Sequence, residues 1–505
     1  MEKYKPLVLI ICDGWGINKH PAHTAITTAT APNFYAYLKK YPHTQLIASG
    51  KEVGLTEGTP GNSEFGHINL GAGRIVYSEI ARIDESISEG SFSTNQVLLE
   101  VFNRIKSQKT KLHLIGLLSD GGIHSHLNHL YALLTLAKQL DLKKVFVHAI
   151  MDGRDTAPKS GLQFIESAET KMKEIGVGKI ASVIGRYYAM DRNQQWDRVL
   201  KSYLAIVAGN GLKFPSATSA IKYAYKHQET DEFITPTVIT TRNQEPVATI
   251  DNGDAVLFFN FRGDRLIELV ASLLPSEFGH FKREKVPQAE YITLTAYNDS
   301  FSLPSLFPKQ EMKNGLGEVL SRKGLTQLRI AETERFAQVT YFFNGMQETV
   351  FEKEERCSIH SPKVESYDLK PEMSAIPLTE EVCTRIQSGN YDFILLTYAN
   401  PALVAHTGNL DATKKAVEVV DECIGKVVES TLAQNGLVII TSSRNIVGSR
   451  LPTDLLNLVP FILIGYEAKP KLRSSGILAD VAPTVLELLQ IPQPAEMTGK
   501  SLLQK

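Results

Sequence analysis

Short apolar runs that stop abruptly at polar or glycine-rich clusters constrain the fold of this 505-residue chain more than any other feature. The clearest runs cover residues 7–12, 112–118, 145–151, 256–261, 393–397 and 437–441. Continuous apolar runs of this length are typical of parallel strands that are buried on both faces. Helix-like stretches, such as 127–140 and 412–431, lie between them. The sequence therefore predicts an α/β fold with a parallel sheet.

The polar clusters at the ends of these runs are the candidate site. In open parallel sheets, ligands bind beyond the carboxyl ends of the strands. Those ends carry D-G-W-G after residue 12, S-D-G-G after 118, D-G-R-D after 151 and R-G-D-R after 261. We therefore expect functional side chains at these places.

Two stretches of the sequence are typical of domain boundaries. Residues 73–84 pass from a glycine-rich to a charged helical sequence, and residues 299–310 are rich in Ser and Pro. If both are hinges, residues 79–309 form a second α/β domain, inserted into a first domain made of residues 1–78 and 310–505. Composition alone leaves three domains in series as the alternative.

The charge balance excludes several classes of partner. Lys and Arg number 54 and Asp and Glu number 55, which gives a formal net charge of −1 and no long-range attraction to nucleic acid or anionic membranes. The apolar run at residues 6–12 is too short for a signal peptide or a membrane span. Four cysteines without a C-x-x-C pair are typical of a reducing compartment. We therefore expect a soluble, cytoplasmic, globular protein.

Ser63 lies in G-T-P-G-N-S-E-F-G-H (58–67), at an expected turn into a helix. Glycines allow the close approach of an anion, and a helix N-terminus supplies amides and a positive dipole end. This placement suits a nucleophilic serine. The alternative is that Ser63 merely caps the helix, which is the commoner role of such serines.

Arginines follow three of the predicted strands. They are Arg154, Arg186, Arg192, Arg262 and Arg265. Guanidinium groups bind phosphate and carboxylate groups bidentately, so a cluster of them predicts an anion pocket. The alternative is a set of surface salt bridges, each worth little.

Asp13, after the first strand, and His406, in A-H-T-G, are possible ligands for a hard metal ion. The alternatives are a helix cap for Asp13 and a hydrogen-bonded core histidine for His406.

Longer motifs occur along the chain in a familiar order. They are CDGWG (12–16), GNSEFGHINLGAGRIVY (61–77), LSDGGIHSH (118–126), DGRDT (152–156), GRYYAMDR (185–192), NFRGDR (260–265), AETERFAQVTYFFNG (331–345), SPKVESYDLKPEMSA (361–375), NPALVAHTGN (400–409) and ADVAPTVLELLQIP (479–492). By these motifs the chain resembles the cofactor-independent phosphoglycerate mutase family over essentially its whole length.

The resemblance implies an alkaline-phosphatase-like, three-layer α/β/α domain that is split in sequence and carries a nucleophilic serine and two Mn²⁺ ions. The inserted domain holds the substrate, and a monomer is expected. In the family's glycolytic reaction, phosphate passes from 3-phosphoglycerate to the serine and returns to the 2-hydroxyl, giving 2-phosphoglycerate. By match, Ser63 is the nucleophile and Asp155 handles the proton on the glycerate oxygen. The residues expected to hold the substrate are His124, Arg154, Asp155, Arg186, Arg192, Arg262, Arg265 and Arg335.

Part of the family's metal-ligand set is present. Asp13, Ser63 and His406 match ligand positions. Asp454 aligns with a further histidine ligand, after a shortened loop, and is the one candidate for a substituted ligand.

The remaining ligand positions are lost. Ala402 stands in place of an aspartate, and Ser443 and Arg444 stand in place of an aspartate and a histidine. Arg335 and Gln338 replace a lysine and a histidine close to the transferred phosphate. A permanently charged guanidinium where a metal should bind is unfavourable. We therefore expect a retained phosphoglycerate pocket with weak or no metal-dependent activity. The alternatives are an active Mn²⁺-dependent mutase that recruits replacement ligands, or a weak phosphatase.

Overall fold

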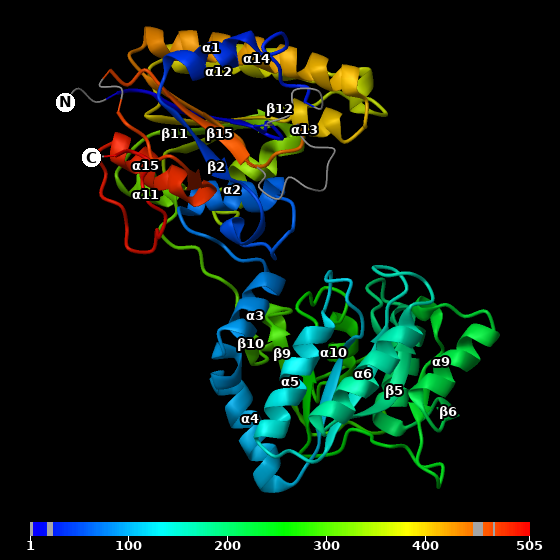
Figure 1. The fold of residues 1–505 in the computed structure, drawn as a ribbon. Helices are drawn as coiled ribbons and strands as arrows, with labels where there is room; N and C mark the ends of the chain where they lie inside the picture. The colour runs from blue at the N-terminus through cyan, green and yellow to red at the C-terminus, as the bar shows by residue number, and fades with distance from the viewer. Residues whose placement is uncertain (1–3, 18–23, 448–457, 468–469, 505) are drawn as a thin grey trace. The chain divides into compact units, whose positions relative to one another are not determined.

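The computed structural model describes residues 4–17, 24–447, 458–467 and 470–504. The chain forms two compact units, Met1–Ser78 with Glu311–Lys505 (unit 1) and Glu79–Gln310 (unit 2). Unit 1 is therefore built from two stretches that are far apart in the sequence. In Figure 1 the first stretch is dark blue and the second runs from green through yellow to red, whereas unit 2 runs from blue through cyan to green.

Unit 1 holds a mainly parallel sheet, which has eight strands among the described residues, in the order β12-β11-β13-β1-β14-β15-β2-β16. The strands are β1 (Leu7–Cys12), β2 (His43–Ile47), β11 (Gln327–Glu332), β12 (Glu354–Ile359), β13 (Phe393–Tyr398), β14 (Leu437–Thr441), β15 (Leu458–Ile464) and β16 (Gly476–Ile477). β1 is central and pairs in parallel with β13 and β14, whereas β15 is antiparallel to both of its neighbours.

Helices cover both faces of this sheet. They are α1 (Pro32–Lys40), α2 (Ser63–Ala72), α11 (Leu316–Arg322), α12 (Ala375–Gln387), α13 (Asn400–Ala405), α14 (Leu410–Ala433) and α15 (Val481–Leu488). Alternate side chains of β1 point to opposite faces. Leu9 packs in the core with α2, α11 and α15, and Ile10 packs with α1, α12 and α14. The result is the three-layer arrangement visible in Figure 1.

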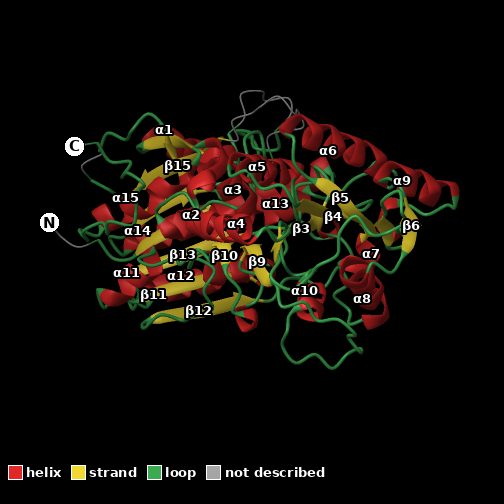
Figure 2. Ribbon diagram, turned by 90° about the horizontal axis from the view of Figure 1, so that it is seen from below, coloured by secondary structure: helices red, strands yellow, loops and turns green. Residues whose placement is uncertain are grey.

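Unit 2 has its own sheet, again with eight described strands, in the order β10-β9-β8-β3-β4-β5-β7-β6. They are β3 (Leu112–Leu117), β4 (Val145–Met151), β5 (Lys179–Gly185), β6 (Leu212–Phe214), β7 (Thr237–Ile239), β8 (Ala255–Phe258), β9 (Glu290–Thr295) and β10 (Ser305–Phe307). All of the paired strands are parallel except β5 with β7. Strands β3, β4 and β5 lie side by side (Figure 2).

Helices also pack on both faces of the unit 2 sheet. They are α3 (Glu79–Ser88), α4 (Gln96–Gln108), α5 (Leu127–Gln139), α6 (Gly161–Ile175), α7 (Arg186–Ala189), α8 (Trp196–Tyr203), α9 (Ala217–Lys226) and α10 (Ile267–Leu273). Leu114 of β3 shares a core with α3, α4, α5, α6 and α9, and Ile115 shares a core with α7, α8 and α10.

The predicted strands and helices are confirmed, with one correction. The run 256–261 was expected to be strand throughout, but β8 ends at Phe258. Beyond it, the side-chain oxygen of Asn260 accepts a hydrogen bond from the amide of Leu117 (2.9 Å), and the amide of Phe261 donates to the carbonyl of His124 (2.9 Å). These bonds turn the chain across the end of β3. No helix in the described part of the chain is long and apolar enough to cross a membrane.

Candidate functional site

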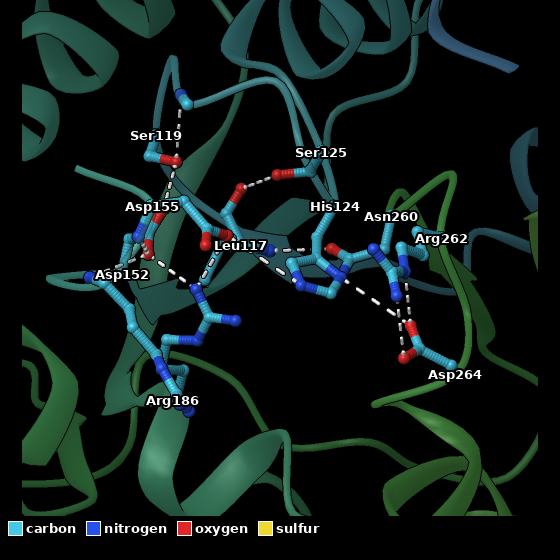
Figure 3. Close-up of polar contacts among 12 residues, drawn as sticks. Leu117, Ser119, His124, Ser125, Asp152, Asp155, Arg186, Asn260, Arg262 and Asp264 are labelled. Carbon is cyan, nitrogen blue, oxygen red and sulfur yellow. Dashed lines mark hydrogen bonds and ion pairs between the residues drawn. The ribbon is translucent and has the colours of Figure 1, made fainter. Parts of the chain in front are cut away.

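The first candidate site lies in unit 2, where polar side chains follow four neighbouring strands (Figure 3). His124 follows β3, Asp155 follows β4, Arg186 begins directly after β5, and Arg262 follows β8. Because these strands are parallel neighbours, their carboxyl ends meet at one edge of the sheet. The structure thus brings together side chains from segments that are up to about 140 residues apart, as the strand pattern predicted.

Arg186 is the buried anchor of this cluster. Its Nη1 donates to Asp152 Oδ1 (2.7 Å) and to Asp155 Oδ2 (2.8 Å). Asp152 Oδ1 also accepts from the amides of Arg154 (3.1 Å) and Asp155 (2.9 Å), and Oδ2 accepts from the hydroxyl of Ser119 (2.7 Å). Asp152 therefore fixes the loop after β4. Asp152 was not among the predicted site residues, although it is the first residue after β4 and belongs to the D-G-R-D cluster.

His124 is buried beside two carboxylates without bonding to either. Its Nε2 lies 3.8 Å from Asp155 Oδ2, and its Nδ1 lies 3.8 Å from Asp264 Oδ1. Among the described residues, Nδ1 has no hydrogen-bond partner. Burial, followed by the charge of Arg186, lowers the pKa of His124. A neutral imidazole with an unused ring nitrogen therefore faces this cluster, in a form suited to a ligand's hydrogen-bonding group.

Three arginines of the cluster keep their side chains largely in solvent. Arg154, Arg192 and Arg262 are 55%, 53% and 54% exposed. Arg192 lies 3.8 Å from Asp264, and Arg262 Nε donates to the same carboxylate at 3.0 Å. Such exposed pairs are weak, so these guanidinium groups are available to an incoming anion.

Arg265 shows that the predicted arginines converge. Burial lowers the pKa of its guanidinium, and the like charges of Arg192, Arg186 and Arg154 lower it further. Arg265 is therefore near enough to each of these three cations to feel its charge, which Asp264 offsets in part. A bound anion would relieve this repulsion.

The second candidate site lies in unit 1, at Asp13, directly after β1. This carboxylate is fully buried. Its Oδ2 accepts from Arg335 Nε (2.6 Å), and its Oδ1 accepts from Ser443 Oγ (2.5 Å) and Arg444 Nε (3.2 Å). Burial alone would raise the pKa of Asp13, but the two guanidinium groups hold it well below its ordinary value. Asp13 is therefore an ion-paired carboxylate rather than a helix cap.

Ser63 is the first residue of α2, and the cap of that helix is Asn62, whose side chain accepts from the amide of Phe65 (2.8 Å). The interpretation of Ser63 as a cap is therefore wrong. Its hydroxyl lies 3.4 Å from Nδ1 of His67, one helical turn later.

His67, which the sequence analysis did not single out, is held between two groups. Its Nδ1 donates to the carbonyl of Ser63 (2.7 Å), and its Nε2 accepts from the hydroxyl of Thr397 (3.1 Å). Burial lowers the pKa of His67 to about 4. Because Nδ1 carries the proton given to the carbonyl, it is not free to accept the proton of the Ser63 hydroxyl. The i, i+4 spacing from Ser63 on a helix was the available signal.

The remaining ligand positions also lie around Asp13. Ala402, in α13, is buried so close to Gly14 that a Cβ on Gly14 would come within 2.9 Å of its Cα. His406 follows α13, and its Nε2 lies 3.4 Å from Arg444 Nη2. It is exposed, so the interpretation as a core histidine is wrong. Asp454 lies outside the described residues.

Comparison with known proteins gives the family. A family model described as "BPG-independent PGAM N-terminus" matches residues 83–299. A 2,3-bisphosphoglycerate-independent phosphoglycerate mutase of Desulforudis audaxviator is 48% identical over 511 residues, covering 100% of each chain. The chain belongs to the 2,3-bisphosphoglycerate-independent phosphoglycerate mutase family. A mutase 1 of Methanosarcina acetivorans is also 48% identical, with 99% of each chain covered.

A solved structure of this mutase family agrees. The phosphoglycerate mutase of Leishmania mexicana, determined at low cobalt concentration, matches with a TM-score of 0.62 and 29% identity, covering 100% of this chain and 98% of that one. The predicted resemblance and the predicted α/β fold are confirmed.

The residues of this mutase-family chain do not fit the pair of Mn²⁺ ions that the resemblance implies. No group of three or more His, Cys, Asp or Glu side chains that could hold a metal occurs in the described ranges. Both oxygens of Asp13 are already bound by guanidinium groups, and Ala402 has no donor atom. The fixed charges of Arg335 and Arg444 occupy the neighbourhood that a divalent cation would need.

Proposed function

We propose that this mutase-family protein binds 2- or 3-phosphoglycerate through the arginine cluster of unit 2, and that it performs metal-dependent phosphoryl transfer weakly or not at all. Unit 2 would be the substrate-binding domain, and unit 1 the domain of the nucleophile Ser63. Family membership supports phosphoglycerate as the ligand. The ion pairs of Asp13 with Arg335 and Arg444 are the reason to expect weak or no metal-dependent activity.

The unit 2 cluster suits a phosphoglycerate in charge. Such a molecule carries about three negative charges, from one phosphate group and one carboxylate. Arg154, Arg192 and Arg262 are exposed and weakly paired, so they can turn to such a ligand at little cost. Arg186 holds Asp155 in place (2.8 Å), which is the position proposed for proton transfer at the glycerate oxygen.

Among the described residues, the Ser63 hydroxyl has neither of the two usual means of activating a nucleophile, a bound metal ion or a general base. A bound metal ion lowers the pKa of an attached oxygen by several units, and each unit lost costs about 1.4 kcal/mol in forming the alkoxide. A neighbouring general base is the usual substitute, but Nδ1 of His67 donates to the Ser63 carbonyl (2.7 Å). Neither form of activation is supported by the described residues.

An active mutase that uses replacement ligands is the second candidate. It is favoured by full-length identity of 46–48% to proteins named as mutases. Asp454 is the proposed extra ligand, in a segment outside the described residues.

Turnover and metal binding separate the two candidates. We expect an enolase-coupled assay of the full chain, with Mn²⁺ added in increasing amounts, to show little or no turnover. Calorimetry with Mn²⁺ alone should show no tight stoichiometric binding, while 3-phosphoglycerate should bind in EDTA. Tight Mn²⁺ binding together with turnover in the usual enzymatic range would refute the proposal, and release of inorganic phosphate would identify a phosphatase instead.

A further inference from the structure

Two guanidinium groups converge on a single buried carboxylate in unit 1. Arg335 Nε and Arg444 Nε lie 2.6 Å and 3.2 Å from the two oxygens of Asp13. Two fixed positive charges therefore face one negative charge. Two further acids of the same segment accept hydrogen bonds from hydroxyl groups, Glu332 from Ser361 (3.1 Å) and Glu334 from Tyr367 (3.0 Å). Burial raises the pKa of Glu332 to about 7, and the charge of Arg335 offsets this only in part. Neither acid forms an ion pair with Arg335 or Arg444 in the described part of the chain.

Both guanidinium groups have N–H donors to spare. Arg335 uses Nε on Asp13 and Nη1 on the carbonyl of Glu334 (2.9 Å). Arg444 uses Nε and Nη2 on Asp13 and brings Nη2 to His406. Within the described residues, Nη2 of Arg335 and Nη1 of Arg444 have no partner. A guanidinium has five donors and satisfies few of them on one carboxylate.

The start of α2 lies against the segment that carries Arg444. A Cβ on Gly66 would come within 2.2 Å of the Ser443 carbonyl oxygen, and a Cβ on Gly61 within 3.5 Å of Arg444 Cβ. Glycine at these places therefore allows the helix N-terminus to approach the segment that carries Arg444. The amides of Ser63 and Glu64 donate to no acceptor among the described residues, and amides at a helix N-terminus favour an anion.

We propose that Arg335, Arg444 and the first turn of α2 form a metal-independent site for a tetrahedral oxyanion, a phosphate group held beside the Ser63 hydroxyl. The site deepens the proposed function, since it gives unit 1 a way to hold phosphate without a metal ion. Its ligand is either inorganic phosphate or the phosphoryl end of a phosphoglycerate.

Charge and geometry favour a phosphate over a carboxylate. One guanidinium is enough to neutralise Asp13, so the second leaves a nearly buried excess charge, which is costly unless an anion balances it. The spare donors belong to two guanidinium groups and a helix end, and therefore come from separate directions. A tetrahedral anion offers oxygens in several directions, whereas a carboxylate is planar.

Inorganic phosphate is the direct probe. We expect calorimetry and ³¹P NMR of the full chain in EDTA to show phosphate binding that Arg444→Gln and Arg335→Gln each weaken at least tenfold. Arg444→Lys keeps the charge but loses the forked set of N–H donors, so its phosphate affinity should lie between that of the parent chain and that of Arg444→Gln. The matched control is Arg262→Gln in unit 2, which removes an arginine from the other anion cluster and should leave this phosphate site intact. If Arg335→Gln fails to fold, the phosphate affinity of Arg444→Gln alone tests the proposal. The Arg444 side chain is 12% exposed and that of Arg335 is 8% exposed, so substitution of Arg444 should disturb folding less.

A crystal soaked in tungstate gives a second readout, with anomalous density expected beside Ser63. Phosphate binding that needs Mn²⁺, or that is lost in Arg262→Gln but unchanged in Arg444→Gln, would overturn the inference. Binding of 3-phosphoglycerate without phosphate binding at Ser63 would overturn this inference and leave the proposed function standing. Tight Mn²⁺ binding with full turnover would overturn the proposed function instead.

Discussion

Arg335 Nε lies 2.6 Å from Asp13 Oδ2, and these two buried residues are 322 positions apart in the sequence. Asp13 directly follows the central strand of unit 1, and Arg335 lies in the 3-10 helix Thr333–Arg335 that follows β11. A carboxylate that the resemblance to the family implies is a metal ligand is thus paired with an internal cation.

Removal of Arg335 should destabilise unit 1 strongly. Arg335→Gln removes the shorter ion pair of the buried Asp13 (2.6 Å) and leaves the longer one to Arg444 (3.2 Å), so we expect a cost of about 2–3 kcal/mol, below that of a buried charge left with no partner. Urea unfolding measures the change. Arg322→Gln is the matched control, because its pair with Glu318 is solvent-exposed and should contribute less than about 1 kcal/mol. Equal effects of the two substitutions would contradict this role of Arg335.

Stability should fall as the pH drops from about 6.5 towards 4, because of His67. Its folded pKa of about 4 lies below the ordinary value of 6.5, so the unfolded chain binds the proton more tightly. The contribution is complete above pH 6.5 and is lost as the pH falls through that window, by about 3 kcal/mol in all. His67→Asn, which keeps a donor for the Ser63 carbonyl, should remove this slope from the free energy of unfolding. An unchanged slope in the variant would show that other groups cause it.

Two arginines of unit 2 should respond differently to substitution. Arg186 is 3% exposed and binds two aspartates, so Arg186→Gln should lower both stability, by about 3 kcal/mol, and 3-phosphoglycerate affinity. Arg262 is 54% exposed, so Arg262→Gln should weaken binding about tenfold with little change in stability. Calorimetry and thermal unfolding check both. A loss of stability in Arg262→Gln equal to that in Arg186→Gln would contradict the assignment.

Metal binding should be recoverable by restoring ligands. Ala402→Asp, Ser443→Asp and Arg444→His together, with Asp454→His, return donor atoms around Asp13 and remove one fixed cation. Ala402 packs on Gly14, so the added carboxylate starts next to Asp13. We expect calorimetry to detect Mn²⁺ binding that the parent chain lacks. Ala402→Asp alone is the control and should bind no Mn²⁺, because Arg444 remains to pair with the new carboxylate. No gain in Mn²⁺ binding by the combined variant would mean that the backbone around Asp13 no longer places these side chains at metal-binding distance.

The sequence predicted the central strands β1, β13 and β14 of unit 1 and β3, β4 and β8 of unit 2, because a strand buried on both faces must be apolar along its whole length. Leu7–Cys12 and Val145–Met151 match their strands to the residue. It also predicted that arginines and acids would gather beyond the strand ends. The run ending at Phe261 was expected to be strand throughout, but the side chain of Asn260 bonds to Leu117 at the end of β3 and the amide of Phe261 bonds to the loop residue His124, so neither continues the strand pairing. Apolarity alone does not distinguish a buried loop from a strand.

The sequence by itself, through its resemblance to the family, predicted which residues occupy the metal-ligand positions, and therefore that Ala402 and Arg444 supply no metal donors there. Only the tertiary structure decided that Arg335 and Arg444 both bond to Asp13, and that Asn62, not Ser63, caps α2. The reason is physical. Residue types are fixed locally, whereas the partner of a buried charge depends on which distant segments the packing of strands and helices brings within a few ångströms.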